Sequence, residues 1–210
     1  MTEAIEPKPE PLLKRPLDVV VATIGLVLTA PLWPLLVVAV KVQDGGPVFY
    51  SQRRWGRGGT VFTVRKFRTM TVGGNAEVRQ AMTNDPRITR VGRLLRSTGL
   101  DELPQILAIL RGDMSLIGPR ALAVGEVVTG ADGSPVRYED VPGFSERLRV
   151  RPGLSGRATI YLPKDAPATE KFAEDLRYIE QQSFWGDVSL IALSLWISLR
   201  GKWEERGSKL

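Results

Sequence analysis

The longest apolar run in the chain lies near its start, from Leu17 to Val42, and carries charge only close to its two ends. A run of about 20 apolar residues is typical of a helix that crosses a bilayer. Pro31 and Pro34 fall in the middle, and each removes a backbone donor and disfavours a straight helix. The arm Leu17–Ala30 reaches roughly 21 Å at about 1.5 Å per residue, short of the roughly 30 Å hydrocarbon core. The pattern therefore favours a broken helix.

Basic residues flank this run on both sides. Lys14 and Arg15 precede it, and a larger group follows it: Lys41, Arg53, Arg54, Arg57, Arg65, Lys66 and Arg68. Positive residues favour the cytoplasmic side of a membrane, so we expect both ends of the run there. A helix–break–helix that enters one leaflet and returns satisfies this. A kinked single span remains the alternative, because proline is tolerated in transmembrane helices. A cleavable signal peptide fits poorly, since a polar, proline-rich leader precedes the run.

Beyond the apolar run, the pattern predicts a β-hairpin followed by mostly helix. The strands are expected at Pro47–Gln52 and Thr60–Arg68, joined by the glycine-rich turn Arg53–Gly59. Glycine and proline residues separate the expected helices, which are Asn75–Met82, Ile88–Leu95, Asp101–Leu110, Ala121–Val128 and Ala168–Gln182. The expected fold class is α+β. Neither a GxGxxG motif after a strand nor a Walker loop is present, which argues against nucleotide binding through those motifs.

The last apolar stretch, Phe184–Trp203, is too short to cross a bilayer and contains Trp185, Trp196 and Trp203. Its polar positions give it a weakly polar face, and tryptophan is favoured at the head-group level of membranes. We expect an amphipathic helix that lies at the membrane interface. A helix buried in the protein core is the alternative.

Composition restricts the chemistry further. The chain has 210 residues, a formal net charge of +6, and neither histidine nor cysteine. A Ser-His triad, a thiolate nucleophile, a zinc finger and an imidazole base are therefore excluded. The basic excess suits lipid head groups, phosphorylated substrates or nucleic acid. Nucleic acid is the weaker match, because binding it needs aromatic residues among the basic ones and only Trp55 lies in such a cluster.

The densest group of reactive side chains lies between Arg93 and Arg120. Asp101 and Glu102 are adjacent acids at an expected helix start, and Thr98-x-x-Asp101 matches a capping box, which would give the acids a purely structural role. Four arginines share this stretch: Arg93, Arg96, Arg111 and Arg120. Arginines bind diphosphates, whereas carboxylates repel them unless a magnesium ion lies between. One carboxylate could then attack phosphorus while its neighbour holds the metal.

With these motifs in place, the chain resembles the small monotopic phosphoglycosyl transferases, also called the bacterial sugar transferase family. This family starts many glycoconjugate pathways, including exopolysaccharide and lipopolysaccharide synthesis. The resemblance extends from about Lys14 to about Ile197 and rests on motifs in this order: Lys14-Arg15-x-x-Asp18, Gly46-Pro47-Val48-Phe49, Gln52-x-Arg54-x-Gly56, Lys66-Phe67-Arg68-Thr69-Met70, Gly92-Arg93-x-Leu95-Arg96, Leu100-Asp101-Glu102-Leu103-Pro104-Gln105, Gly112–Arg120, Arg151–Gly156 and Asp175-x-x-Tyr178.

The resemblance implies a two-step reaction. Asp101 is expected to attack a UDP-sugar, form a covalent aspartyl phosphosugar and release UMP; a polyprenyl phosphate such as undecaprenyl phosphate then takes the phosphosugar. Asp101 and Glu102 are expected to hold Mg²⁺. The expected substrate-binding residues are Lys66, Arg96, Pro119, Arg120 and Asp175, of which Arg96 is assigned on charge alone.

The resemblance also implies an architecture. Residues 1–13 are expected to be a flexible leader, 14–42 a re-entrant membrane helix broken at Ala30 and Pro31, and 43–210 a small, mainly helical catalytic domain. The protein is expected to be monotopic, on the cytoplasmic face of a bacterial inner membrane. Membrane lipid is an expected partner, nucleic acid is not, and a homodimer stays open. A catalytically inactive membrane scaffold of the same fold is the alternative function.

The chain departs from the family pattern at four places. Ala30 replaces the serine before Pro31, and Ala121 replaces the second proline of a Pro-Arg-Pro turn. Ala108 replaces an asparagine, and Arg157-Ala158-Thr159 replaces Trp-Ala-Gln. We expect these positions to affect the break, the stiffness of the turn around Arg120, and the choice of sugar.

Overall fold

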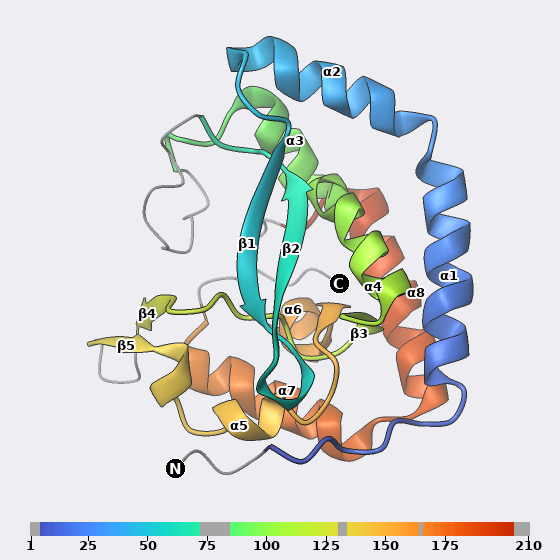
Figure 1. The fold of residues 1–210 in the computed structure, drawn as a ribbon, viewed down its shortest axis with the longest axis vertical. Coiled ribbons are helices and arrows are strands. Elements are labelled where there is room, and N and C mark those ends of the chain that lie inside the picture. The colour runs from blue at the N-terminus through green and yellow to red at the C-terminus, as the bar shows by residue number, and fades with distance from the viewer. Residues whose placement is uncertain (1–4, 72–84, 130–133, 164–165, 204–210) are drawn as a thin grey trace.

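A computed structural model describes residues 5–71, 85–129, 134–163 and 166–203. It is an α+β structure built around a long β-hairpin (Figure 1). The hairpin pairs β1 (Phe49–Trp55) with β2 (Val61–Phe67) in antiparallel register, through a short 3₁₀ turn at Arg57–Gly59. The predicted hairpin is confirmed; the first strand lies two to three residues closer to the turn than predicted, and the second is one residue shorter at each end.

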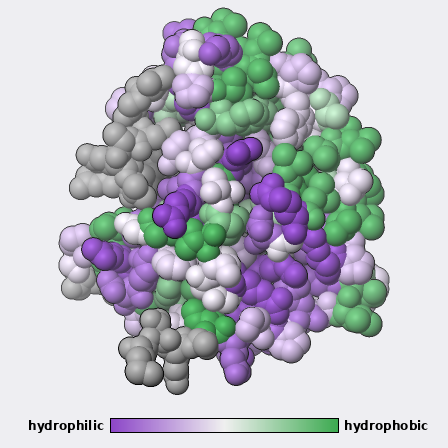
Figure 2. Space-filling model, in the orientation of Figure 1, coloured by the Kyte–Doolittle hydropathy of each residue, from purple (hydrophilic) through white to green (hydrophobic). Residues whose placement is uncertain are grey.

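Two apolar helices form the right-hand and upper edges of the molecule in Figure 1. They are α1 (Lys14–Thr29) and α2 (Leu32–Asp44), bent by 65° at the break between them. The break lies at Ala30 and Pro31, as predicted. Pro34 falls in the first turn of α2, where its missing N–H costs no helical hydrogen bond. Figure 2 shows hydrophobic surface over these two helices.

Thr29 links α1 and α2 at the break, where Ala30 stands in place of the family's serine. Its hydroxyl donates to the carbonyl of Gly25 in α1 (2.7 Å) and accepts from the indole N–H of Trp33 in α2 (3.4 Å). Backbone bonds from Ala30 to Val27 and from Trp33 to Ala30 continue across the bend. The turn is therefore held by the residue before Ala30, and it does not need a hydroxyl at position 30.

No helix in the described part of the chain is long and apolar enough to cross a bilayer alone; α1 and α2 pass such a test only as a bent pair.

A buried polar network fixes the base of α1. Lys14 Nζ donates to Asp187 (2.7 Å) in α8, to the Tyr178 hydroxyl (3.1 Å) in α7 and to the Ile117 carbonyl (2.8 Å) in β3. One turn later, Asp18 accepts from the Ser115 hydroxyl and the Leu116 N–H, both at 3.0 Å. Lys14 and Asp187 thus form a buried ion pair, and Asp18 is held by hydrogen bonds to one of its two oxygens. The network attaches the apolar helix pair to the rest of the fold.

The remaining elements surround the hairpin. They are α3 (Arg90–Thr98), a 3₁₀ helix (Leu100–Gln105), α4 (Ile106–Arg111), β3 (Ser115–Ile117), β4 (Val127–Thr129), β5 (Pro135–Arg137), a 3₁₀ turn (Tyr138–Asp140), α5 (Phe144–Arg147), β6 (Gly153–Ser155), α6 (Arg157–Tyr161), α7 (Ala168–Gln181) and α8 (Phe184–Arg200). β3 pairs with β6 in parallel, and β4 with β5 antiparallel. Of the predicted helices, Asn75–Met82 lies outside the described residues, whereas α3, α7 and α8 confirm three others to within a few residues.

Two predictions about elements were wrong. Ala121–Val128 is not a helix, because Trp55 donates its N–H to the Leu122 carbonyl (2.9 Å) and Val124 donates to the Arg53 carbonyl (3.1 Å). This stretch therefore runs beside β1 and ends in β4. The helix expected at Asp101–Leu110 is divided, since Pro104 lies inside a 3₁₀ helix and α4 begins only after it.

Two motif loops meet backbone to backbone beneath the hairpin. A side chain on Gly118 would come within 2.5 Å of the Arg151 carbonyl, and one on Gly153 within 2.1 Å of the Gly118 N–H nitrogen. Only glycine permits this approach. This close approach lets the Gly153 N–H donate to the Pro119 carbonyl (2.8 Å), which fixes the position of the residue before Arg120.

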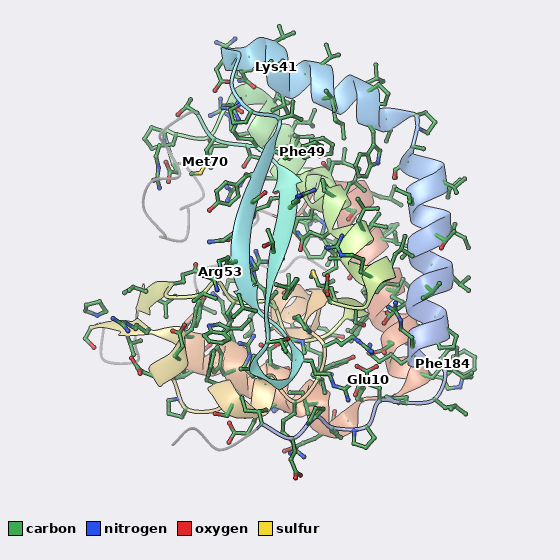
Figure 3. The ribbon with its side chains drawn as sticks, viewed as in Figure 1. Glu10, Lys41, Phe49, Arg53, Met70 and Phe184 are labelled. Carbon is green, nitrogen blue, oxygen red and sulfur yellow. The ribbon has the colours of Figure 1, made fainter. Side chains whose placement is uncertain are left out.

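The described part of the leader lies against the body of the protein. The Lys8 N–H donates to the Arg149 carbonyl (2.8 Å), Arg57 donates to the Lys8 carbonyl (2.6 Å), and Glu10 pairs with Arg151. Figure 3 labels Glu10 on the segment that leads into α1. Residues 8–10, which fall in the leader predicted to be flexible, therefore have specific partners.

Candidate active site

A cavity of about 640 Å³ opens between the hairpin, the 3₁₀ helix at Leu100–Gln105 and the loops beneath them. Most of the predicted site residues line it: Lys66, Arg96, Asp101, Glu102, Arg120 and Asp175. Pro119 is instead buried, and it contributes its carbonyl to the backbone contact with Gly153. The fold therefore places predicted site residues from four separate segments of the chain around one cavity.

The acidic pair lies in the first turn of the 3₁₀ helix, directly after Gly99. Gly99 has a positive φ of 75°, which reverses the chain between α3 and this helix. The Thr98 hydroxyl donates back to the carbonyl of Leu94 (2.8 Å), and no side chain caps the 3₁₀ helix. The capping box considered from the sequence is therefore not formed, and Asp101 and Glu102 are left to face the cavity.

The two carboxylates differ in their electrostatic surroundings. Burial and the adjacent Glu102 raise the pKa of Asp101 to about 7, although Lys66 and Arg96 act in the opposite direction. Burial also acts to raise the pKa of Glu102, but Arg120 and Lys66 outweigh it and hold that pKa below its usual value. Glu102 accepts a hydrogen bond from Gln105, and the Arg120 guanidinium lies 3.7 Å from its carboxylate.

Cations on one face of the hairpin oppose the acids. Tyr50, Gln52 and Arg54 alternate along β1, and Lys66 lies opposite Tyr50 in β2; all four line the cavity. Burial and Arg54 lower the pKa of Lys66 to about 8, although the two carboxylates partly offset this. Arg54 is buried, and its Nε has no hydrogen-bond partner among the described residues. Side chains alternate along a strand, so Arg54 lies on the same face of β1 as Tyr50, the residue opposite Lys66. This alternation could have identified Arg54 as a site residue from the sequence.

Two buried arginines hold the backbone on either side of the Arg120–Ala121 peptide. Arg147 donates to the Arg120 carbonyl (3.0 Å), and Arg54 donates to the Ala121 carbonyl. Asp175 forms an ion pair with Arg147 at 2.6 Å, with both side chains 3% exposed. Asp175 lines the cavity, yet its carboxylate is bonded to Arg147. These bonds restrain the turn that lacks its second proline, and no sequence motif predicted the role of Arg147.

The acidic pair is suited to bind a magnesium ion together with substrate phosphates. Magnesium is often held by one or two carboxylates and by phosphate oxygens, and a cation would offset the repulsion that raises the Asp101 pKa. Among the described residues, no group of three or more acidic side chains could hold a metal unaided. Water and substrate phosphate oxygens are the usual further ligands of a magnesium ion held by two carboxylates.

The structure shows what surrounds the remaining departures from the family pattern, at Ala108 and at Arg157-Ala158-Thr159. Ala108 is buried, and its carbonyl accepts from the N–H groups of Gly112 (3.1 Å) and Asp113 (3.0 Å). Arg157 pairs with Glu174 (3.2 Å) and its guanidinium lies over the Tyr161 ring, 5.2 Å from the ring centroid, whereas Thr159 lines the cavity. Thr159 and Ala121 are thus departures from the family pattern that line the cavity.

Comparison with known proteins identifies the family. The profile described as "Bacterial sugar transferase" matches residues 9–201. The chain belongs to the bacterial sugar transferase family. Its relatives include the UDP-glucose:undecaprenyl-phosphate glucose-1-phosphate transferases of Caulobacter vibrioides (40% identity over 86% of this chain and 67% of that protein) and Escherichia coli (41% over 88% and 39%). Another is the exopolysaccharide production protein ExoY of Rhizobium meliloti (37% over 85% and 81%).

The family and these names identify the chain as an enzyme, a phosphoglycosyl transferase. The match covers all the motif residues that line the cavity, from Gln52 to Asp175. The chain spans only 39% of the Escherichia coli protein, about two thirds of the Caulobacter one and most of ExoY.

Proposed function

We propose that this enzyme transfers a sugar 1-phosphate from a UDP-sugar to a polyprenyl phosphate and releases UMP. The observation that carries the proposal is the position of Asp101 and Glu102, side by side in the wall of a cavity among Lys66, Arg96 and Arg120. Acids and cations in one cavity suit a diphosphate substrate together with a metal. The names of the relatives make UDP-glucose and undecaprenyl phosphate the first substrates to test.

In the first step, a carboxylate oxygen of Asp101 attacks the phosphorus that carries the sugar. An Asp101–phosphosugar bond forms, the bond to the UMP oxygen breaks, and UMP leaves with that electron pair. Arg120 and Lys66 balance the charge that develops on the phosphate oxygens. Asp101 and Glu102 would hold the magnesium ion, which would supply further charge neutralisation when bound.

In the second step, a phosphate oxygen of the lipid attacks the same phosphorus. The Asp101–phosphorus bond breaks, the carboxylate is restored, and the product is a polyprenyl diphosphosugar. Arg54 suits the binding of these anions, because its buried Nε has no partner in the described part of the chain. Each substrate thus meets the same carboxylate in turn.

The lipid substrate requires contact with a membrane. We propose that α1 and α2 enter one leaflet and return to the cytoplasmic face of a bacterial inner membrane. Exposed apolar side chains on both helices support this, including Leu28 (73% exposed), Leu35 (66%) and Val42 (80%). Burying such side chains in lipid is favourable by about 0.8 kcal/mol per CH₂ group. Trp185 (75% exposed) and Trp196 on α8 support an interfacial position for that helix.

The test is UMP release by the purified enzyme in detergent or lipid nanodiscs. With Mg²⁺ and undecaprenyl phosphate, we expect UMP release from UDP-glucose or from another UDP-sugar in a panel. Chelation of the metal with excess EDTA should abolish it. UMP release that continues undiminished in EDTA would contradict the metal assignment. An inactive scaffold would release no UMP under any of these conditions.

A further inference from the structure

The cavity that holds the acidic pair extends to α1 and α8. This part of its lining is mostly small and apolar, with Thr29, Ser194 and Ser198 as its hydroxyl residues. We call its apolar side the apolar arm: Ala22 and Gly25 from α1, Ile106 from α4, Leu154 from β6, and Leu195 and Leu199 from α8. None of the α1 and α8 residues that line the cavity carries a charge. The cavity thus has one charged end and one apolar end.

The two helices that form the walls of the arm are fixed together at one end. The Lys14–Asp187 ion pair joins the first turn of α1 to the first turn of α8. Figure 3 labels Phe184, the first residue of α8, beside the lower end of α1. Farther along, both helices line the same cavity; Ile106, which directly follows the 3₁₀ helix that carries Asp101, lies in one core cluster with Ala22 of α1. The two helices are therefore joined at one end and line the same cavity beyond it.

Exposure shows that the arm opens to the surface of the molecule. Leu195 is 60% exposed and Leu199 is 84% exposed, although both line the cavity. On the floor, Ala22 is 1% exposed, and a methyl group on Gly25 would contact the Ile106 side chain at 3.7 Å. Small residues on α1 and exposed leucines on α8 leave a channel that water solvates poorly and a hydrocarbon chain can fill.

We propose that the apolar arm binds the isoprene units next to the phosphate of the lipid acceptor and so directs that phosphate to Asp101. The inference rests on the proposed function, and it adds a binding site for the lipid chain. The arm and the acidic pair line one cavity, so an occupant that reaches both must combine a hydrocarbon chain with a phosphate at one end. A polyprenyl phosphate meets both requirements, whereas an acyl phospholipid places its phosphate beyond a glycerol unit.

The first test compares acceptor chain lengths in Gly25→Leu, which fills the arm, and in Val27→Leu, an exposed control on the same helix that does not line the cavity. For the wild-type enzyme, kcat/KM should rise with the number of isoprene units and then level off. Gly25→Leu should lower kcat/KM for undecaprenyl phosphate about tenfold or more and affect an acceptor with a single isoprene unit far less. Val27→Leu should follow the wild type.

The second test is independent of how well that variant folds. A photo-crosslinking amino acid at Leu195 should label undecaprenyl phosphate, whereas the same group at Trp185, which is exposed on α8 but does not line the cavity, should not. An acyl phospholipid should not compete. If the wild type transfers no phosphosugar to any acceptor, the proposed function fails and the arm with it. If the wild type is active, but Gly25→Leu behaves like Val27→Leu and Leu195 labels no better than Trp185, only the proposed lipid site in the arm is overturned.

Discussion

Arg120 is held in place by other side chains. The Arg120 carbonyl accepts from Arg147, and Arg147 is in turn fixed by Asp175, with both partners buried. Buried charge-assisted hydrogen bonds of this kind are among the stronger ones in proteins, and the planar guanidinium makes them directional. The backbone at Ala121, where the family has proline, is thus restrained from outside the turn. Asp175 accordingly acts through Arg147 on Arg120.

Arg147→Lys keeps the charge but loses the planar fork, so it should lower kcat/KM for the UDP-sugar by about ten- to a hundredfold. Asp175→Asn should have a similar effect, and the double variant should lose little more, because both changes break the same chain of contacts. Steady-state kinetics on the three variants provides the test. Arg149→Lys, an exposed neighbour, is the control. Fully additive losses would show that Asp175 and Arg147 act separately.

Substitutions of the two acids, Asp101 and Glu102, should impair activity in different ways. Asp101→Asn keeps the shape and removes the nucleophile, so turnover should fall by roughly a thousandfold or more, and no magnesium concentration should restore it. Glu102→Gln leaves the nucleophile in place and weakens metal binding. A magnesium titration of both variants separates these effects, because added metal should raise the activity of Glu102→Gln alone. Rescue of Asp101→Asn would contradict the assignment of roles.

At the scale of elements, the bend between α1 and α2 should return the chain to the side from which it entered. The chain has no natural cysteine, so Leu12→Cys (a residue 91% exposed) and Pro47→Cys each provide a single reporter on one side of the helix pair. An impermeant thiol reagent should label both positions only after cells are permeabilised. Labelling of one position in intact cells would mean that the helix pair spans the membrane.

The buried pair between α1 and α8 should matter more for stability than an exposed pair. Lys14→Met leaves Asp187 charged and buried, which costs about 3–5 kcal/mol, whereas Arg111→Met removes an exposed ion pair with Asp113 and should cost less than about 1 kcal/mol. Unfolding in detergent, followed by circular dichroism, measures both. Combining Lys14→Met with Asp187→Leu should recover part of the loss. Equal effects of the two single changes would show that the network is not structural.

Sequence patterns predicted the elements whose cause is local. The break at Pro31 follows from a missing backbone donor, and the hairpin follows from alternation around a glycine-rich turn. Ala121–Val128 was mistaken for a helix because its extended form depends on bonds to β1, which lies far away in sequence. The acidic pair was predicted from its motif, but the role of Arg147 depends on tertiary contacts to Arg120 and Asp175 that no local pattern encodes.

For the molecule as a whole, the cavity gives the two substrates of the proposed reaction access to one carboxylate. Its charged end presents Lys66, Arg96 and Arg120 to a soluble diphosphate, and its other end reaches the apolar helices α1 and α8. Figure 2 shows hydrophobic surface over α1 and α2, on one side of the molecule. In the proposed reaction, the diphosphate would enter from water at the charged end and the lipid phosphate from the bilayer at the apolar end.

The central claim is that Asp101 becomes covalently modified, and intact-protein mass spectrometry tests it most directly. The enzyme is incubated with Mg²⁺ and its UDP-sugar but no lipid acceptor, so that the second step cannot occur. We predict a mass increase equal to one sugar phosphate, an adduct that peptide mapping places on Asp101, and its disappearance when polyprenyl phosphate is added. Asp101→Asn should show no adduct. An adduct on another residue, or full turnover by Asp101→Asn, would contradict the account and favour direct attack by the lipid phosphate.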